Sequence, residues 1–126
     1  MYMFSQTSGD IFQNNKWIGS GAAGQGKGLK NPAMQNVPNI GPLPQGKYKI
    51  GKPYRHPKLG PLTFDLTPDP ANEMFGRSEF RIHGFAPGCD HNNPGTSSEG
   101  CCCQEHPARQ YVADNIDSDN DLEVVE

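Results

Sequence analysis

The sequence lacks the long apolar runs of a membrane protein and the leader of an exported one. Only 33% of its 126 residues are hydrophobic, and no run approaches the roughly 20 apolar residues of a transmembrane helix. The N-terminus from Met1 to Thr7 has neither the basic region nor the apolar core of a secretory signal peptide. We therefore expect a protein that is made in the cytoplasm without a signal peptide and that has no membrane partner.

The sequence also lacks a helix-forming composition and a strong excess of charge of one sign. Fifteen glycines and twelve prolines weaken helix interiors and favour turns and strand ends, which excludes a helical bundle and predicts a mainly β fold. The net charge is only −3, whereas nucleic-acid binders are usually strongly basic, so we expect no nucleic-acid partner. Six of the fourteen acidic residues gather in an acidic C-terminal segment, residues 114–126.

The length is that of one domain, residues 1–126, without room for a separate substrate domain. Alternating apolar and polar residues predict short strands, and the segment after the cysteines, with Tyr111 and Val112 available for packing, predicts one short helix. We expect strands within 2–18, at 47–54, at 62–67, ending at His83 and at 122–125, and a helix at 105–114.

The glycine-rich segment 19–28 imitates two phosphate-binding motifs. Gly19 to Gly24 fits G-x-G-x-x-G, and Gly21 to Lys27 fits most of G-x-x-x-x-G-K. Both motifs need a helix that begins at the glycines and directs its N-terminal amides at phosphate. Because residues 25–32 are poor helix formers, we expect a mobile loop here and no nucleotide site.

A histidine and a cysteine downstream have the pattern of a catalytic pair. His83 is followed by Gly84, and Cys101 ends the run Ser98-Glu99-Gly100-Cys101. A thiol is a good nucleophile only as a thiolate, and an ordinary cysteine needs a base to become one at neutral pH. His83 is the candidate base, and the glycines beside the two reactive groups allow backbone atoms to approach a reacting atom.

These residues resemble the L,D-transpeptidase catalytic domain, whose signature is His-Gly followed by Ser/Thr-His-Gly-Cys. The segment 39–50, with Pro-Gln-Gly-Lys-Tyr-Lys-Ile, is similar to the family's Pro-x-Gly-x-Tyr-x-Ile, and Gly76-Arg77-Ser78 and Asn31-Pro32 are similar to its type VI secretion effector branch. The resemblance covers about residues 8–111. It implies a compact β-sandwich or barrel with one short C-terminal helix.

The resemblance also implies a mechanism, which needs no metal and no cofactor. His83 takes the proton of Cys101, and the thiolate attacks the third residue of a peptidoglycan tetrapeptide stem, releasing the terminal D-alanine. Water then resolves the thioester, or a D-amino acid or a second stem does, giving L,D-carboxypeptidase or L,D-transpeptidase activity. The Gly84 carbonyl would fix the imidazole tautomer, and the amides of Gly100 and Cys101 would stabilise the oxyanion.

The sequence departs from the family pattern around the cysteine. The usual histidine between Ser98 and Gly100 is Glu99, and the apolar-Arg pair that often follows the nucleophile is Cys102-Cys103. Another group must therefore hold the substrate carboxylate. We expect substrate binding by Arg77, Ser98, Glu99 and Arg81, with Arg109 as a further candidate.

The resemblance to the type VI branch also implies where the protein acts and which partners it has. An effector of this kind is secreted into the periplasm of a rival bacterium, where it meets peptidoglycan stem peptides. Its expected partners are a secretion apparatus component and a cognate immunity protein that protects the producer.

Two alternatives keep other roles open for the same residues. Cys89-x-His91 and Cys101-x-Cys103-x-x-His106 supply ligand types that zinc prefers, although the spacings match no common zinc ribbon. A catalytically inactive peptidoglycan-binding module would keep the fold and lose the reaction.

Overall fold

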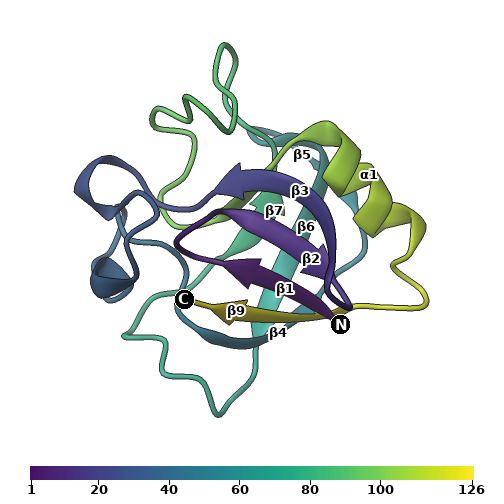
Figure 1. Ribbon diagram of the computed structural model, residues 1–126, viewed down its shortest axis with the longest axis horizontal. Helices are drawn as coiled ribbons and strands as arrows, with labels where there is room; N and C mark the ends of the chain where they lie inside the picture. The colour runs from purple at the N-terminus through teal and green to yellow at the C-terminus, as the bar shows by residue number, and fades with distance from the viewer.

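Nine strands and one α-helix make up the computed structural model, which describes all residues from 1 to 126 (Figure 1). The strands are β1 (Tyr2–Ser5), β2 (Asp10–Gln13), β3 (Lys16–Ala22), β4 (Gly46–Ile50), β5 (Tyr54–His56), β6 (Gly60–Pro68), β7 (Arg81–His83), β8 (Cys102–Gln104) and β9 (Asp121–Val125). The helix is α1 (His106–Asp114), and two short 3₁₀ turns occupy Gly26–Gly28 and Pro32–Met34. The predicted mainly β fold with one short helix near the C-terminus is confirmed.

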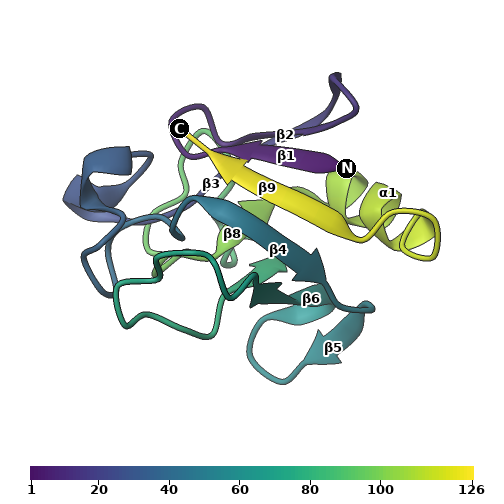
Figure 2. The same cartoon turned by 90° about the horizontal axis from the view of Figure 1, so that it is seen from below.

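Eight of the strands close into a barrel. The sheet order is β4-β9-β1-β2-β3-β8-β7-β6, and β6 pairs back with β4, while β5 extends the sheet beyond β6. Most neighbours are antiparallel, but β1 with β9 and β7 with β8 are parallel. Figure 2 shows β4 and β9 side by side. A barrel is one of the two architectures predicted from the sequence, and its closure leaves few exposed strand edges.

The core follows from strand alternation. Side chains on alternate positions point to one side of a strand, and here the inward positions carry large apolar groups such as Tyr2, Phe4, Phe64 and Ile82, all fully buried. Helix α1 buries Ala108 and Val112 against the barrel, where it contacts β3 and β6. The nine-residue helix is the longest in the chain, and no helix has the length and apolarity to cross a bilayer.

Most of the predicted strands and the predicted helix are found with small shifts of their ends. The predicted strand 47–54 is wrong in extent, because β4 ends at Ile50 and β5 begins only at Tyr54. Pro53 directly precedes β5, and proline has no amide hydrogen to donate within a sheet. The prediction of a mobile loop over 19–28 is also wrong for its first part. Strand β3 continues to Ala22, since Gly21 lets the carbonyl of Cys103 approach more closely than a Cβ would allow. No α-helix begins at these glycines.

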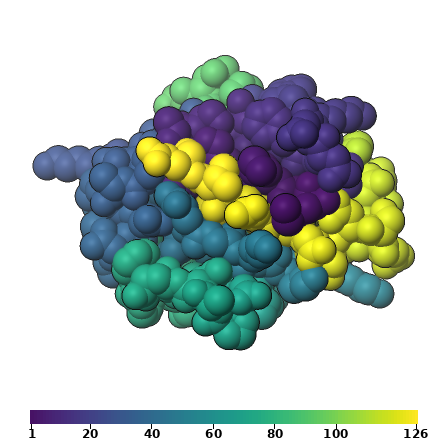
Figure 3. Space-filling model, turned by 60° about the horizontal axis from the view of Figure 1, so that its bottom comes forward, coloured from purple at the N-terminus to yellow at the C-terminus, as the bar shows by residue number.

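The acidic C-terminal segment contributes a strand to the barrel. Strand β9 lies between β1 and β4, and Figure 3 shows it in yellow between the N-terminal strand and the β4 region. Leu122 and Val124 point into the core, while the acidic residues alternate with them. The sequence of this segment therefore combines a buried apolar face with a charged outer face.

Removal of one buried side chain from β9 tests this packing. We expect Leu122→Ala to lower the free energy of unfolding by about 2–5 kcal/mol, because it leaves a cavity in the core. The neighbouring outward variant Glu123→Ala is the matched control and should change it by less than about 0.5 kcal/mol. Urea denaturation followed by fluorescence measures both, and equal effects of the two variants would contradict the placement of β9 in the barrel.

Candidate active site

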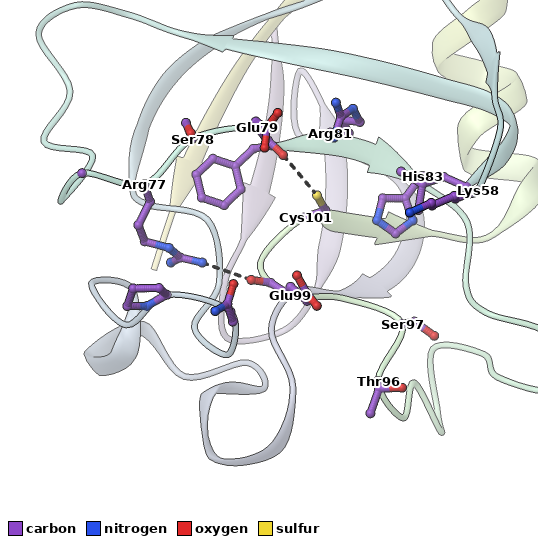
Figure 4. Close-up of a pocket in the computed structure, with 15 residues that line it drawn as sticks. Lys58, Arg77, Ser78, Glu79, Arg81, His83, Thr96, Ser97, Glu99 and Cys101 are labelled. Atoms are coloured by element: carbon purple, nitrogen blue, oxygen red, sulfur yellow. Dashed lines mark hydrogen bonds between the residues drawn. The ribbon is translucent and has the colours of Figure 1, made fainter.

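One cleft contains most of the residues that the sequence predicts for the site. Its volume is about 580 Å³, and it lies on the outer side of β7, beside the segment that leads into β8 (Figure 4). Its lining includes His83, Cys101, Arg77, Arg81 and Glu99. Sequence reasoning did not single out Lys58, Glu79, Thr96 and Ser97, which also line it. Gly84, Ser98 and Gly100 lie outside the lining.

The pairing of β7 with β8 brings the histidine and the cysteines together. In this parallel pair Ile82 lies opposite Cys102 and His83 lies opposite Cys103. Ile82 and Cys102 point into the core, so alternation directs their neighbours to the outer face. Cys101 directly precedes β8 and therefore lies beside Arg81, diagonally across from His83.

The diagonal placement separates His83 from the predicted nucleophile in the resting structure. No hydrogen bond joins the two: the Cys101 sulfur contacts the carbonyl oxygen of Glu79 at 3.9 Å. The sulfur beside the imidazole belongs to Cys103, 3.6 Å from Nδ1 and 3.7 Å from Nε2 of His83. A sulfur almost equally distant from both nitrogens lies against the ring rather than in line with one lone pair. The direct pairing expected for Cys101 is thus not made here.

His83 is held as a neutral imidazole by its surroundings. The ring is almost completely buried, and its Nδ1 lies 2.7 Å from the carbonyl oxygen of Gly84. That carbonyl can only accept, so Nδ1 carries the proton and Nε2 is left with its lone pair. Burial lowers the pKa of His83, and the cations Arg109 and Arg81 lower it further, which opposes the Gly84 hydrogen bond. At neutral pH the ring can therefore accept a proton at Nε2.

Cys101 rests as a thiol with cationic groups around it. Burial raises its pKa, and Glu99 adds to the rise, whereas the backbone amide and the guanidinium of Arg81 and the charge of Arg77 lower it. Cys101 lines the cleft, while Cys102 and Cys103 are fully buried, and burial raises the pKa of Cys102 to about 12 and that of Cys103 well above its ordinary value. Cys101 is the cysteine of this run that a substrate in the cleft can reach.

Ser98 stabilises the turn that carries Cys101, residues 98–101, which we call the cysteine turn. Its buried hydroxyl donates to the carbonyl of Cys101 at 2.7 Å and accepts from the amides of Gly24 at 2.9 Å and Gly100 at 3.0 Å. These bonds use the whole hydroxyl, so a direct contact between Ser98 and substrate, as expected from the sequence, is not supported.

The same contact occupies one of the two amides predicted for the oxyanion hole. The amide of Gly100 donates to Ser98 and is not free for an oxyanion, whereas the amide of Cys101 makes no hydrogen bond within the chain. Gly100 itself is required by the turn, because its φ is +140° and a Cβ would lie 2.5 Å from Nη2 of Arg77.

Arg77 fastens two loops together. Its Nη1 donates to the carbonyls of Gln35 at 2.6 Å and Pro42 at 2.8 Å, and its Nη2 donates to those of Gly41 at 3.0 Å and Glu99 at 3.1 Å. The guanidinium also lies over the ring of Phe80, 5.0 Å from its centroid. Arg77 therefore connects the segment 35–42 with the turn that carries Cys101, and its terminal nitrogens are already engaged.

The ligand set of the zinc alternative does not come together. No group of three histidine, cysteine, aspartate or glutamate side chains is placed to hold a metal ion. His91 instead pairs with Glu105, with 2.8 Å between Nδ1 and the carboxylate oxygen. The structure gives no support to a zinc site built from Cys89, Cys101 and their neighbours.

The fold is an eight-stranded barrel, and one cleft in it is lined by a thiol and an imidazole. A family model described as the Tlde1 domain matches residues 20–126, which is most of the chain. The chain belongs to this family, which is a family of type VI secretion effectors. No curated protein and no solved structure matches the chain. The predicted relation to type VI secretion effectors is confirmed, and the L,D-transpeptidase chemistry stays a prediction.

The bridging role of Arg77 gives a testable expectation. Arg77→Gln should lower the free energy of unfolding by about 2–4 kcal/mol, because charge-assisted bonds to four carbonyls are lost. It should also speed alkylation of Cys101 by iodoacetamide, since the turn at Glu99 is released.

The exposed arginine Arg55, which does not line the cleft, provides the control Arg55→Gln. Both its stability and its alkylation rate should equal those of the wild type. An unchanged alkylation rate in Arg77→Gln, measured by mass spectrometry over time, would show that Arg77 does not hold the cysteine turn.

Proposed function

We propose that this protein is a secreted antibacterial enzyme that modifies peptidoglycan tetrapeptide stems through a Cys101 thioester. The observation that carries the proposal is that Cys101 and His83 line the same cleft, fixed there by two parallel strands. The family supports the same direction, because type VI effectors act on competing bacteria. The reaction is release of the terminal D-alanine, followed by hydrolysis or by transfer to an amine.

The chemistry begins from a neutral pair. In the proposed reaction the Cys101 side chain changes rotamer, so that its sulfur leaves the Glu79 carbonyl and approaches His83. Nε2 of His83 then takes the thiol proton as the sulfur attacks the stem carbonyl. Catalytic contacts are often long before substrate binds, so the resting separation is compatible with this step.

The remaining steps return both groups to their starting state. When the tetrahedral intermediate collapses, the carbon–nitrogen bond breaks and the imidazolium gives its proton to the departing amine. The acyl group stays on Cys101 as a thioester. Water, or the amine of a D-amino acid or second stem, attacks the thioester with His83 as the base, and the thiol is regenerated with its proton.

The backbone amide of Cys101 belongs to the nucleophile's own residue and is a candidate donor to the developing oxyanion. It is unpaired within the chain, unlike that of Gly100. A preorganised donor of this kind stabilises charge that appears only in the transition state. The oxyanion hole of this protein therefore uses Cys101 itself together with groups other than the Gly100 amide.

The place of action follows from the substrate. Peptidoglycan stems are reached in the periplasm of the target cell, so the protein is delivered there with the help of a secretion apparatus component. A cognate immunity protein then protects the producing cell, and blocking the cleft is the direct way for it to do so.

A second function, binding of peptidoglycan without catalysis, is favoured by one observation. The imidazole of His83 contacts Cys103 and not Cys101, which is an arrangement without an activated nucleophile. In this reading the cleft holds the stem peptide and no bond breaks. The first experiment below separates the two functions.

Substitution of the thiols tests the enzyme. We expect the wild-type protein to release D-alanine from purified tetrapeptide muropeptides, and Cys101→Ala to lose at least about 10³-fold of this activity because no thioester can form. Cys89→Ser is the control, since Cys89 does not line the cleft. Chromatography of the muropeptides measures the product. Stem binding without any D-alanine release by the wild-type protein would support the inactive binding module instead.

The pH dependence should show the lowered pKa of His83. Only the neutral imidazole accepts the thiol proton, so kcat/KM falls as the pH drops through this pKa and the ring becomes charged. Because the pKa of His83 is lowered from 6.5, the acidic limb should be centred below pH 6.5. A limb centred above pH 7 would contradict the role of a buried neutral imidazole as the base.

A further inference from the structure

Arg109 is a partly buried arginine outside the cleft. It belongs to α1, does not line the cleft and makes no ion pair within the chain. A role for Arg109 in holding a substrate carboxylate, one of the expectations from the sequence, is therefore not supported. Buried cations are usually paired, because burial disfavours charge, and burial lowers the pKa of Arg109. An unpaired cation at this place must have other partners in the fold.

The partners of the Arg109 guanidinium lie on both sides of β7. Its Nε donates to the carbonyl of Gln104 at 3.0 Å, at the end of β8, and its Nη1 donates to the carbonyl of Pro61 at 2.9 Å, near the start of β6. Strand β7 lies between β8 and β6 in the sheet. The guanidinium therefore spans the sheet at the end of β7, where Gly84 follows His83.

Gly84 packs closely against this guanidinium. A Cβ added to Gly84 would lie 2.8 Å from Nη2 and 3.0 Å from Cζ of Arg109, closer than side chains normally approach. The φ of Gly84 is not positive, so the backbone here has no left-handed conformation that would itself require glycine. Glycine is required by the neighbouring guanidinium, which cannot move aside without losing its two hydrogen bonds.

The contact at Gly84 affects the base of the proposed reaction. The carbonyl oxygen of Gly84 lies 2.7 Å from Nδ1 of His83, which leaves the lone pair on Nε2. A displaced Gly84 peptide would weaken this bond and allow the other tautomer, in which Nε2 carries the proton and cannot accept one. The position of the Gly84 peptide therefore decides whether Nε2 can act as a base.

The charge of Arg109 acts on the same ring. Burial lowers the pKa of His83, and among its charged neighbours Arg109 lowers it most, ahead of Arg81 from β7 and His56 from β5. The thiol of Cys103 from β8 lies against the ring. The other titratable or charged groups of the cleft stay unchanged in the variants below; they are Lys58, Arg77, Glu79, Glu99 and Cys101.

We propose that Arg109 is the positioning residue of His83: its guanidinium, anchored to β8 and β6, packs against Gly84 and holds the carbonyl that fixes the tautomer of the imidazole. Arg109 does not line the cleft, so it acts through Gly84. The catalytic consequence rests on the proposed function, in which Nε2 of His83 is the base. The contact itself and its effect on the ring can be measured without substrate.

NMR spectroscopy of the full chain, with histidine labelled at the ring nitrogens, tests the proposal. In the wild type we expect the Nδ1-protonated tautomer of His83 and a pKa below 6.5. Arg109→Gln removes the charge and the two hydrogen bonds, so the pKa should rise by about 0.5–1 unit and the other tautomer should become populated. Arg109→Lys keeps the charge without the planar fork, so it should keep most of the lowered pKa and lose the tautomer preference.

Two further variants serve as controls for this measurement. The signal of His83 is the one that is absent from His83→Gln. Lys47→Gln removes an exposed cation from β4, which does not pair with β7, and it should change neither the pKa nor the tautomer of His83. A pKa and a tautomer of His83 that stay as in the wild type in Arg109→Gln would overturn the proposal.

Gly84→Ala tests the same contact from the other side. The added methyl group should displace the guanidinium and populate the second tautomer of His83 while Arg109 is still present. In the Arg109→Gln background the shorter side chain leaves room, so Gly84→Ala should add little, and the two effects should be non-additive. Gly84→Ala and Arg109→Lys also keep the test open if Arg109→Gln does not fold. Additive effects, or a tautomer that Gly84→Ala leaves unchanged, would contradict the contact.

Kinetic measurements separate this proposal from the proposed function. If the wild-type protein releases D-alanine, the acidic limb of kcat/KM in Arg109→Gln should move to higher pH by the same amount as the pKa of His83 measured by NMR. A limb that stays in place while this pKa moves would show that His83 is not the base, which contradicts the proposed function and not the contact. If the wild type releases no D-alanine, the proposed function fails, and the tautomer and pKa of His83 still decide the role of Arg109.

Discussion

The parallel pairing of β7 with β8 is the constraint on which the cleft depends. The two strands are only three residues each, and the chain between them forms no regular strand or helix. Their pairing is stabilised from the core side, where Ile82 and Cys102 are fully buried opposite each other. Burial of these two side chains fixes the register, and the register places Arg81 and His83 beside Cys101 and Cys103. A shift by one residue would turn the reactive groups into the core.

Polar contacts to the backbone then give the cleft its shape. Ser98 holds the turn before Cys101 from inside, and Arg77 ties the same turn to the segment 35–42 from outside. Both side chains therefore act within the protein through the backbone, since carbonyls and amides are their partners.

Sequence patterns predicted the parts of the structure that depend on alternation. The apolar positions of β4, β6 and β9 are visible in the sequence, and the motif at His83 and Cys101 led to residues that do share one cleft. The engagement of Arg77 and of the Gly100 amide was not predictable, because a backbone carbonyl or a hydroxyl acceptor leaves no signal at a fixed spacing. The contact between Cys103 and His83 follows from the strand register, which the sequence does not specify for two segments so far apart.

The protonation states of Cys101 and His83 in the resting structure also follow from their burial. Burial disfavours the charged forms of both groups, raising the pKa of Cys101 and lowering that of His83, so the pair rests uncharged. A thiolate and imidazolium formed permanently would react with any electrophile, whereas under the proposed function a neutral pair separated across the strands would react only once a substrate fills the cleft. Arg81 also acts on the thiol, because its charge favours the thiolate of Cys101 and it lines the same cleft.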